Sequence, residues 1–147
     1  MDESSDDAAI SRRVREFELA RRPASVGVLN GQLADWLPSF GIPDATLHAV
    51  LVCCDELVAN ACQHAGTTGG PIGMRIEVMD RGMLIGCSYR ARDFDLSAHR
   101  SPQLHTPVSL RDIGGLGLHL MYALCQRCDY RFHDDHHHIT LEWRWSP

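Results

Sequence analysis

The chain has 147 residues, of which 44% are hydrophobic, and its formal net charge at pH 7 is −5. This length suits one compact domain with a real core, and the acidic balance argues against nucleic-acid binding, which usually needs a basic face. All fourteen basic residues are arginines, which excludes a P-loop and an ordinary protein-kinase site, because both place a lysine at the phosphates.

The acidic N-terminus, residues 1–11, shows no hydrophobic periodicity. We expect it to be disordered and followed by a single domain over residues 12–147. It lacks the apolar stretch of a secretory signal, and no run of eighteen apolar residues occurs in the chain. The sequence therefore predicts a cytoplasmic protein without a membrane span. Arginines gather between positions 12 and 22, but Glu16 and Glu18 interrupt them, which favours a solvated edge.

The first half of the chain is predicted to contain a strand and two helices. Residues 14–19 alternate weakly, as an edge strand does. A helix should follow Pro23, with Ser25 near its N-cap and an end at Gly41. Asp44 is a suitable N-cap for the next helix, which should run to about His64 on an apolar three-four spacing.

The second half is predicted to contain two hairpins, separated by a long polar loop and a helix. We expect strands over 74–78 and 83–89, a loop over 90–113, a helix opening at 114, a strand at 130–132, a turn at 133–137 and a last strand at 139–145. This order predicts an α/β (α+β) two-layer sandwich, with one mixed sheet of about five strands and three helices on one face.

A polar row is expected on the second helix. Glu56 and Asn60 lie four residues apart, with His64 one turn further, on a helix that is otherwise strongly apolar. Burying such groups without partners costs about 1–3 kcal/mol each, so the row must meet solvent, hydrogen-bond partners or a ligand. On spacing alone, the exposed stripe of a surface helix is the favoured interpretation.

A glycine-rich segment opens the third helix, with the sequence Gly114-Gly115-Leu116-Gly117-Leu118. Glycines at such a junction let backbone amides approach an anion, and the helix dipole favours phosphate there. The same glycines could equally serve loop flexibility or tight helix packing. Taken alone, the segment is a weak signal of phosphate binding.

The two motifs in this order resemble a known family. Residues 56–65 (ELVANACQHA) resemble the N box of the GHKL ATPase superfamily, and residues 114–121 (GGLGLHLM) resemble its second G box. With Asp93-Phe94-Asp95 after the hairpin, the chain is most similar to the anti-sigma-factor serine kinases. The resemblance covers roughly residues 14 to 145 and implies the Bergerat-type ATPase fold of that superfamily.

The resemblance also implies a function and its residues. It implies ATP and Mg²⁺ as cofactors, with Asn60 holding Mg²⁺ and Glu56 accepting the proton of a partner's serine hydroxyl. It implies that the phosphates are cradled by Gly114, Gly115, Gly117 and Leu118. The implied partners are an anti-sigma antagonist, which carries the serine, and a sigma factor. Members of the family commonly work as homodimers.

The first G box departs from the family pattern. That box has an Asp-x-Gly, whose Asp accepts a hydrogen bond from the adenine amino group, but counting back from Phe94 places Tyr89 and Ala91 there. A tyrosine hydroxyl still accepts a hydrogen bond, yet the side chain is uncharged and larger. Three alternatives stay open. The loop register shifts so that Asp93 reads adenine; the pocket binds another ligand or binds ATP weakly; or the site is lost, leaving a non-catalytic partner-switching module.

A second candidate site is the pair Cys125 and Cys128, whose spacing is typical of metal or redox sites. Structural zinc needs four ligands, and the His-rich tract 133–138 is the only nearby source, so two thiols at a helix end are the favoured interpretation. A metal-responsive regulator stays as the alternative. A redox role is disfavoured, because the helix dipole at a C-terminus does not stabilise a thiolate.

Overall fold

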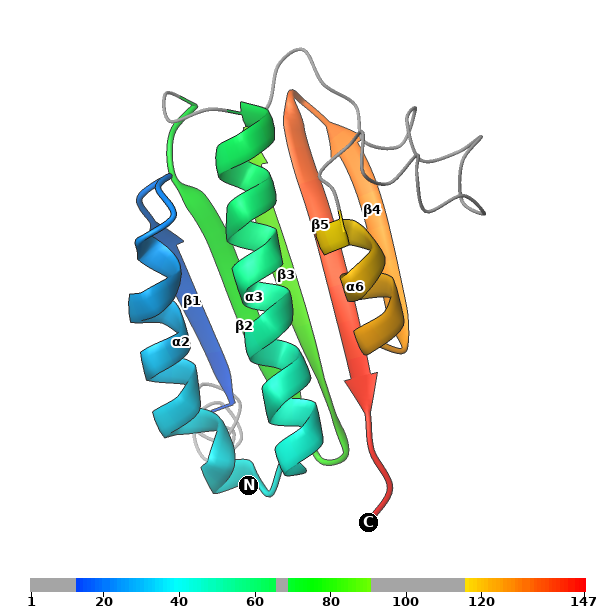
Figure 1. Ribbon diagram of the computed structural model, residues 1–147. Helices are drawn as coiled ribbons and strands as arrows, with labels where there is room; N and C mark the ends of the chain where they lie inside the picture. The colour runs from blue at the N-terminus through cyan, green and yellow to red at the C-terminus, as the bar shows by residue number, and fades with distance from the viewer. Residues whose placement is uncertain (1–12, 66–68, 91–115) are drawn as a thin grey trace, which may run out of the picture.

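The computed structural model describes residues 13–65, 69–90 and 116–147, which form a sheet covered by helices on one face (Figure 1). The predictions for residues 1–11 and 91–113 lie outside these ranges. The elements in chain order are β1 (Val14–Leu19), α2 (Ser25–Trp36), the 3-10 helix η1 (Leu37–Phe40), α3 (Asp44–Ala65), β2 (Ile72–Met79), β3 (Gly82–Arg90), α6 (Leu116–Leu124), β4 (Arg127–His133) and β5 (His136–Arg144).

The sheet has five strands in the order β1-β2-β3-β5-β4. The predicted sandwich of five strands and three α-helices is confirmed, but neighbouring strands are all antiparallel, where a mixed sheet was predicted. The chain reverses direction at each connection. The two helices between β1 and β2 therefore leave these strands antiparallel, whereas the single helix between β3 and β4 leaves those strands parallel. β3 and β4 do not pair, because β5 lies between them and is antiparallel to both.

The last hairpin is tighter than predicted. Only Asp134 and Asp135 form its turn, and both have positive φ angles, 52° and 60°, as a two-residue type I′ turn requires. His136 and His137, which were predicted to lie in the turn, belong instead to β5 and pair with β4 and β3. The prediction was too wide because a histidine run carries no clear period-two signal.

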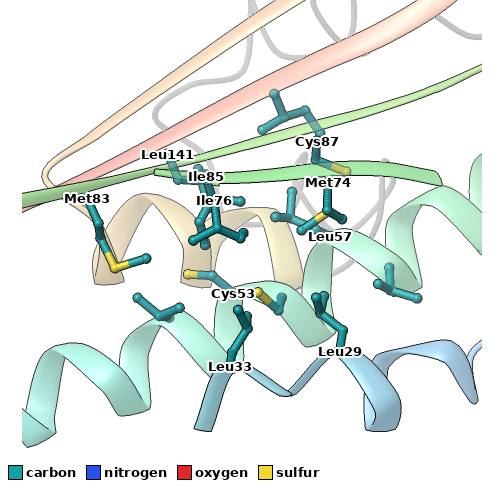
Figure 2. Close-up of a cluster of buried hydrophobic side chains, with 14 of the residues drawn as sticks. Leu29, Leu33, Cys53, Leu57, Met74, Ile76, Met83, Ile85, Cys87 and Leu141 are labelled. Carbon is teal, nitrogen blue, oxygen red and sulfur yellow. The ribbon is translucent and has the colours of Figure 1, made fainter. Parts of the chain in front are cut away.

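The core lies between the helices and the sheet (Figure 2). The predicted apolar stripes of α2 and α3 are confirmed, since Leu29, Leu33 and Leu57 are completely buried. By length and composition, α3 is the one helix of the described ranges that could cross a membrane. In this fold the same apolar character lets one side of α3 pack on the sheet. Other core residues that Figure 2 labels are Cys53, Met74, Ile76, Met83, Ile85, Cys87 and Leu141.

Candidate functional site

The C-terminal half of α3 carries the predicted polar row. Asp55 and Ala59 are exposed, Glu56 is half-buried and Asn60 is only 1% exposed. The exposed stripe of the helix therefore contains Asp55 and Ala59, each one residue before a member of the polar row. The interpretation of the row as an exposed surface stripe is wrong for Asn60. The side chain of His64 lies outside the described residues.

Asn60 holds a buried acceptor. Its Oδ1 atom has no hydrogen-bond partner within the described ranges, and an unsatisfied buried acceptor costs about 1–3 kcal/mol. A neutral amide oxygen is a hard ligand of the kind that Mg²⁺ takes in proteins. The side chain thus fits a role as a cation ligand, and a ligand would remove the cost of its burial.

Glu56 lies one turn before Asn60 on the same side of α3. Burial is the main cause that raises the pKa of its carboxyl group, and the negative charge of Asp55 raises it further. Asp55 itself accepts a hydrogen bond from Asn30 Nδ2 at 3.2 Å. No arginine or histidine of the described ranges forms an ion pair with Glu56. A carboxylate whose pKa is raised is a stronger proton acceptor than an ordinary one.

Tyr89, which the resemblance places at the adenine-reading position, is the penultimate residue of β3 and is 1% exposed. Its hydroxyl has no hydrogen-bond partner in the described part of the chain. The Arg21 guanidinium carbon lies 5.5 Å from the centre of its ring. Burial raises the pKa of Tyr89 far more than Arg21 lowers it, so the side chain is a neutral phenol. Asp93, the alternative adenine reader, lies outside the described residues.

Arg21 is a residue that sequence reasoning missed. The arginine-rich segment was predicted to be a solvated edge, but Arg21 is only 5% exposed. It donates from Nε to Gly70 O at 3.0 Å, from Nη1 to Arg90 O at 2.7 Å and from Nη2 to Gly69 O at 3.2 Å. Its guanidinium therefore joins the start of α2 to the segment before β2 and to the end of β3.

Gly69 makes this contact possible. A Cβ atom at position 69 would lie 2.5 Å from Arg21 Nη1, so any other residue there would require the guanidinium to shift. This close approach of a buried arginine has no local signal in the sequence.

His137 is the second residue that was missed. It is completely buried on β5, directly opposite Tyr89 on β3. Its ring centre lies 5.1 Å from that of Tyr89, 5.5 Å from that of Tyr130 and 5.0 Å from that of Phe132. Tyr130 OH and His137 Nδ1 form a hydrogen bond. Aromatic side chains therefore cover the helix-facing side of the sheet beyond the reach of α6.

The phosphate-binding prediction is described only in part. Gly114 and Gly115 lie outside the described residues, whereas Gly117 and Leu118 fall in the first turn of α6. α6 packs against α3 and begins beside its C-terminal half (Figure 1). Glu56 and Asn60 belong to the same half of α3.

The described ranges give no support to a metal site at Cys125, Cys128 and the His-rich tract. Within residues 13–65, 69–90 and 116–147, no three His, Cys, Asp or Glu side chains converge in a way that could hold a metal ion. His133 instead contacts Asp134, with 3.1 Å between Nε2 and Oδ2. Cys125 directly follows α6 and Cys128 is the second residue of β4, so both lie at the other end of α6 from Gly117.

Comparison with known proteins gives a family model and structural likenesses. A model described as the histidine kinase-like ATPase domain matches residues 19–143, and no curated protein matches the sequence. The crystal structure of the RsbU and RsbW domains of Rv1364c from Mycobacterium tuberculosis has a TM-score of 0.64 and 18% identity, covering 89% of this chain and 32% of that one. A chain of the SiaB–SiaC complex from Pseudomonas aeruginosa has a TM-score of 0.66 and 15% identity, covering 95% of both. The chain thus spans about a third of the Rv1364c chain, and at these identities both likenesses concern the fold.

Proposed function

The chain belongs to the histidine kinase-like ATPase family, and from this premise we propose that it is an ATP-dependent serine kinase of the anti-sigma-factor type. It phosphorylates a serine of an anti-sigma antagonist, sequesters a sigma factor, and works in the cytoplasm as a single domain over residues 12–147, paired as a homodimer. Family membership implies ATP as the ligand in general. The likeness to an RsbW domain and to the SiaB–SiaC complex supports a regulatory, partner-binding role.

The observation that carries the proposal is the buried amide oxygen of Asn60. Asn60 Oδ1 has no partner within the described ranges, and it lies one helical turn from a carboxyl group whose pKa is raised. A buried acceptor without a partner calls for an explanation, and a bound ligand supplies one. We assign Asn60 to Mg²⁺, which selects hard oxygen ligands.

Glu56 is proposed as the general base. It accepts the proton of the antagonist's serine hydroxyl as that oxygen attacks phosphorus. Its raised pKa, caused first by burial and then by Asp55, strengthens it as a proton acceptor, and its half-buried position leaves it accessible to a partner.

The glycine-rich segment and Tyr89 complete the proposed site. Backbone amides around Gly114, Gly115, Gly117 and Leu118 would bind the phosphates. The Tyr89 hydroxyl would serve the adenine base as a neutral hydrogen-bond donor or acceptor. When bound, ATP would supply the phosphoryl group, and Mg²⁺ would supply the positive charge that neutralises the phosphate oxygens. The contribution of the protein is then positioning and electrostatic stabilisation, as phosphoryl transfer generally requires.

Titration calorimetry with Mg-ATP tests nucleotide binding. We expect the parent to bind and Asn60→Ala to lose the magnesium-dependent part of the affinity. Asn30→Ala is the matched control, because Asn30 Oδ1 is also buried without a partner in the described ranges, yet it lies on α2, across α3 from α6 (Figure 1). Equal loss in both variants would contradict the assignment of Asn60.

A phosphoryl-transfer assay tests the kinase activity itself. The parent and Glu56→Ala are mixed with labelled ATP and a candidate antagonist that carries the acceptor serine. We expect Glu56→Ala to bind Mg-ATP but to transfer label at least about a hundredfold more slowly, the usual contribution of a general base. Transfer at the parental rate would remove Glu56 from that role.

A non-catalytic partner-switching module is the second candidate function, and the burial of Tyr89 favours it. This side chain and Arg21 occupy the helix-facing side of the sheet where the family places its adenine-reading carboxylate. If the parent shows no heat with Mg-ATP up to millimolar concentration but still binds the antagonist, this second function replaces the first.

A further inference from the structure

Two cysteines at the far end of α6 have no place in the proposed kinase site. Cys125 directly follows the last residue of α6, and Cys128 is the second residue of β4. Neither thiol is in a disulfide and both are partly buried, whereas Cys53, Cys54 and Cys87 are buried. The pair is the one Cys-x-x-C in the sequence.

Cys128 lies near enough to Cys125 to act on its thiol, since the Cys128 side chain lowers the pKa of Cys125. In its thiol form Cys125 donates to Met121 O, with 2.8 Å between Sγ and the oxygen. The turn between them is held to β5, because Gln126 N donates to Glu142 O at 2.9 Å. Trp143 Nε1 donates to Leu124 O at 2.9 Å on the other side. The backbone therefore presents the pair in one fixed arrangement.

Hydrogen bonds give Cys125 thiolate character. The pKa of Cys125 is lowered, first by the hydrogen bond from Cys128 and then by the backbone amides of Cys125 and Arg127, against an opposing effect of burial. The helix dipole was expected to disfavour a thiolate here, whereas these local donors act in the opposite direction. Burial instead raises the pKa of Cys53 and of Cys87 to about 12 each, so those two thiols stay protonated.

Solvent reaches Cys125 through a surface hollow. A volume of about 350 Å³ opens between the start of α3 and the end of α6, and Cys125 is part of its wall. Thr46, Ala49, Gln126 and Trp143 also line it. A small-molecule oxidant can therefore approach Cys125 from this side without unfolding the helix.

We propose that Cys125 and Cys128 form a redox-active dithiol, which a low-molecular-weight disulfide such as oxidised glutathione converts to an intramolecular disulfide. The Cys125 thiolate attacks one sulfur of the reagent, forms a mixed disulfide and releases one equivalent of thiolate. Cys128, deprotonated by solvent, then attacks Cys125 Sγ and displaces the second equivalent. Two electrons pass from the protein to the reagent, and reduced glutathione in excess reverses both steps.

Cys53 is the rival partner for Cys125. The two are close enough for charge on Cys125 to raise the pKa of Cys53. Cys53, however, is completely buried on α3 and stays protonated, so it is a poor nucleophile for the second step. Cys128 is only partly buried and lies three residues from Cys125, so we assign it as the second thiol.

Redox titration of the full chain tests the proposal. The reduced protein is equilibrated in buffers of graded oxidised and reduced glutathione, quenched with acid, alkylated with iodoacetamide and digested for mass spectrometry. We expect a disulfide that joins Cys125 to Cys128 and four alkylated cysteines. Six alkylated cysteines across the whole range, or a disulfide that joins Cys125 to Cys53, would overturn the proposal.

Single substitutions separate the two roles. Cys128→Ser should stop at a glutathione adduct on Cys125, because the resolving thiol is gone, while Cys125→Ser should form neither adduct nor disulfide. Cys62→Ser is the matched control and should behave as the parent, since burial raises the pKa of the half-buried Cys62 thiol. An adduct on Cys128 in Cys125→Ser at the same rate would overturn the assignment of Cys125 as the attacking group.

A kinetic measurement on the unaltered chain covers the case in which a variant fails to fold. Brief exposure of the native reduced protein to iodoacetamide should alkylate Cys125 about tenfold faster than Cys62, because alkylation follows the thiolate fraction and access. Equal rates at the two positions would contradict the proposed reactivity.

Discussion

The two ends of the layer between helices and sheet are built from different chemistry. Where α3 begins, side chains such as Leu33, Met83 and Leu141 fill the space and are completely buried (Figure 2). Where α3 ends, Arg21, Asn60 and other polar groups are buried instead. The first end needs only apolar volume. The second keeps acceptors without partners in the described ranges, which costs stability and is typical of a ligand site.

The largest effect is expected at the apolar end. Leu33→Ala removes a completely buried side chain of α2 and should lower the free energy of unfolding by about 2–5 kcal/mol, because a cavity remains. Urea unfolding followed by circular dichroism measures it. Val28→Ala on the same helix is the control, since Val28 is 64% exposed and its truncation should change stability by at most about 0.5 kcal/mol. Equal costs would mean that α2 does not pack as described.

The next effect is expected from Arg21 at the polar end. Arg21→Ala leaves three backbone carbonyls without their donor and should cost about 2–4 kcal/mol. Arg22→Ala is the adjacent control, because that side chain is exposed. A urea midpoint for Arg21→Ala that matches the control would show that water replaces the guanidinium without loss, and the polar end would then be less rigid than the contacts indicate.

Asn60 should respond in the opposite direction. Asn60→Leu removes an acceptor that has no partner among the described residues and keeps the volume, so the free energy of unfolding without nucleotide should rise by up to about 1 kcal/mol. The same variant should lose any stabilisation by Mg-ATP. Thermal unfolding with and without Mg-ATP measures both. A loss of stability as large as that of Leu33→Ala would show that Asn60 is a packing residue.

The smallest effect concerns Glu56 and pH. Its folded-state pKa is raised, chiefly by burial, so the folded state binds this proton more tightly than the unfolded state does. The ionised carboxylate therefore weakens the fold, and this penalty appears as pH rises through the raised pKa and is absent in acid.

Glu56→Gln checks that sign. The variant should be slightly more stable than the parent at neutral pH, and the difference should vanish in acid, as urea midpoints over a pH series would show. Glu18→Gln, an exposed position on β1, is the control. A Glu56→Gln variant that is less stable than the parent at neutral pH would mean that the carboxylate has a cationic partner.

Much of the fold could be predicted because its signals are local. Val14–Leu19 is a strand with the predicted bounds, and the strands on either side of Asp80-Arg81 alternate as expected. The pairing of β5 between β3 and β4 could not be predicted, because strand order depends on contacts between distant segments. The motif residues of the site were found by resemblance, whereas Arg21 and His137 were not, since their partners are far away in the sequence.

The sequence by itself determined the helices and strands, the apolar stripes and the placement of Glu56 and Asn60 one turn apart. These follow from periodicities of 3.6 and 2 residues, which the chain carries locally. Only the tertiary structure decided which polar groups are buried. Arg21 and Arg22 are neighbours of the same type, yet one is buried and the other exposed. The physical reason is that the burial of a side chain depends on the segments that pack around it. The Arg21 guanidinium is buried because it binds carbonyl groups 48 to 69 positions away in the sequence.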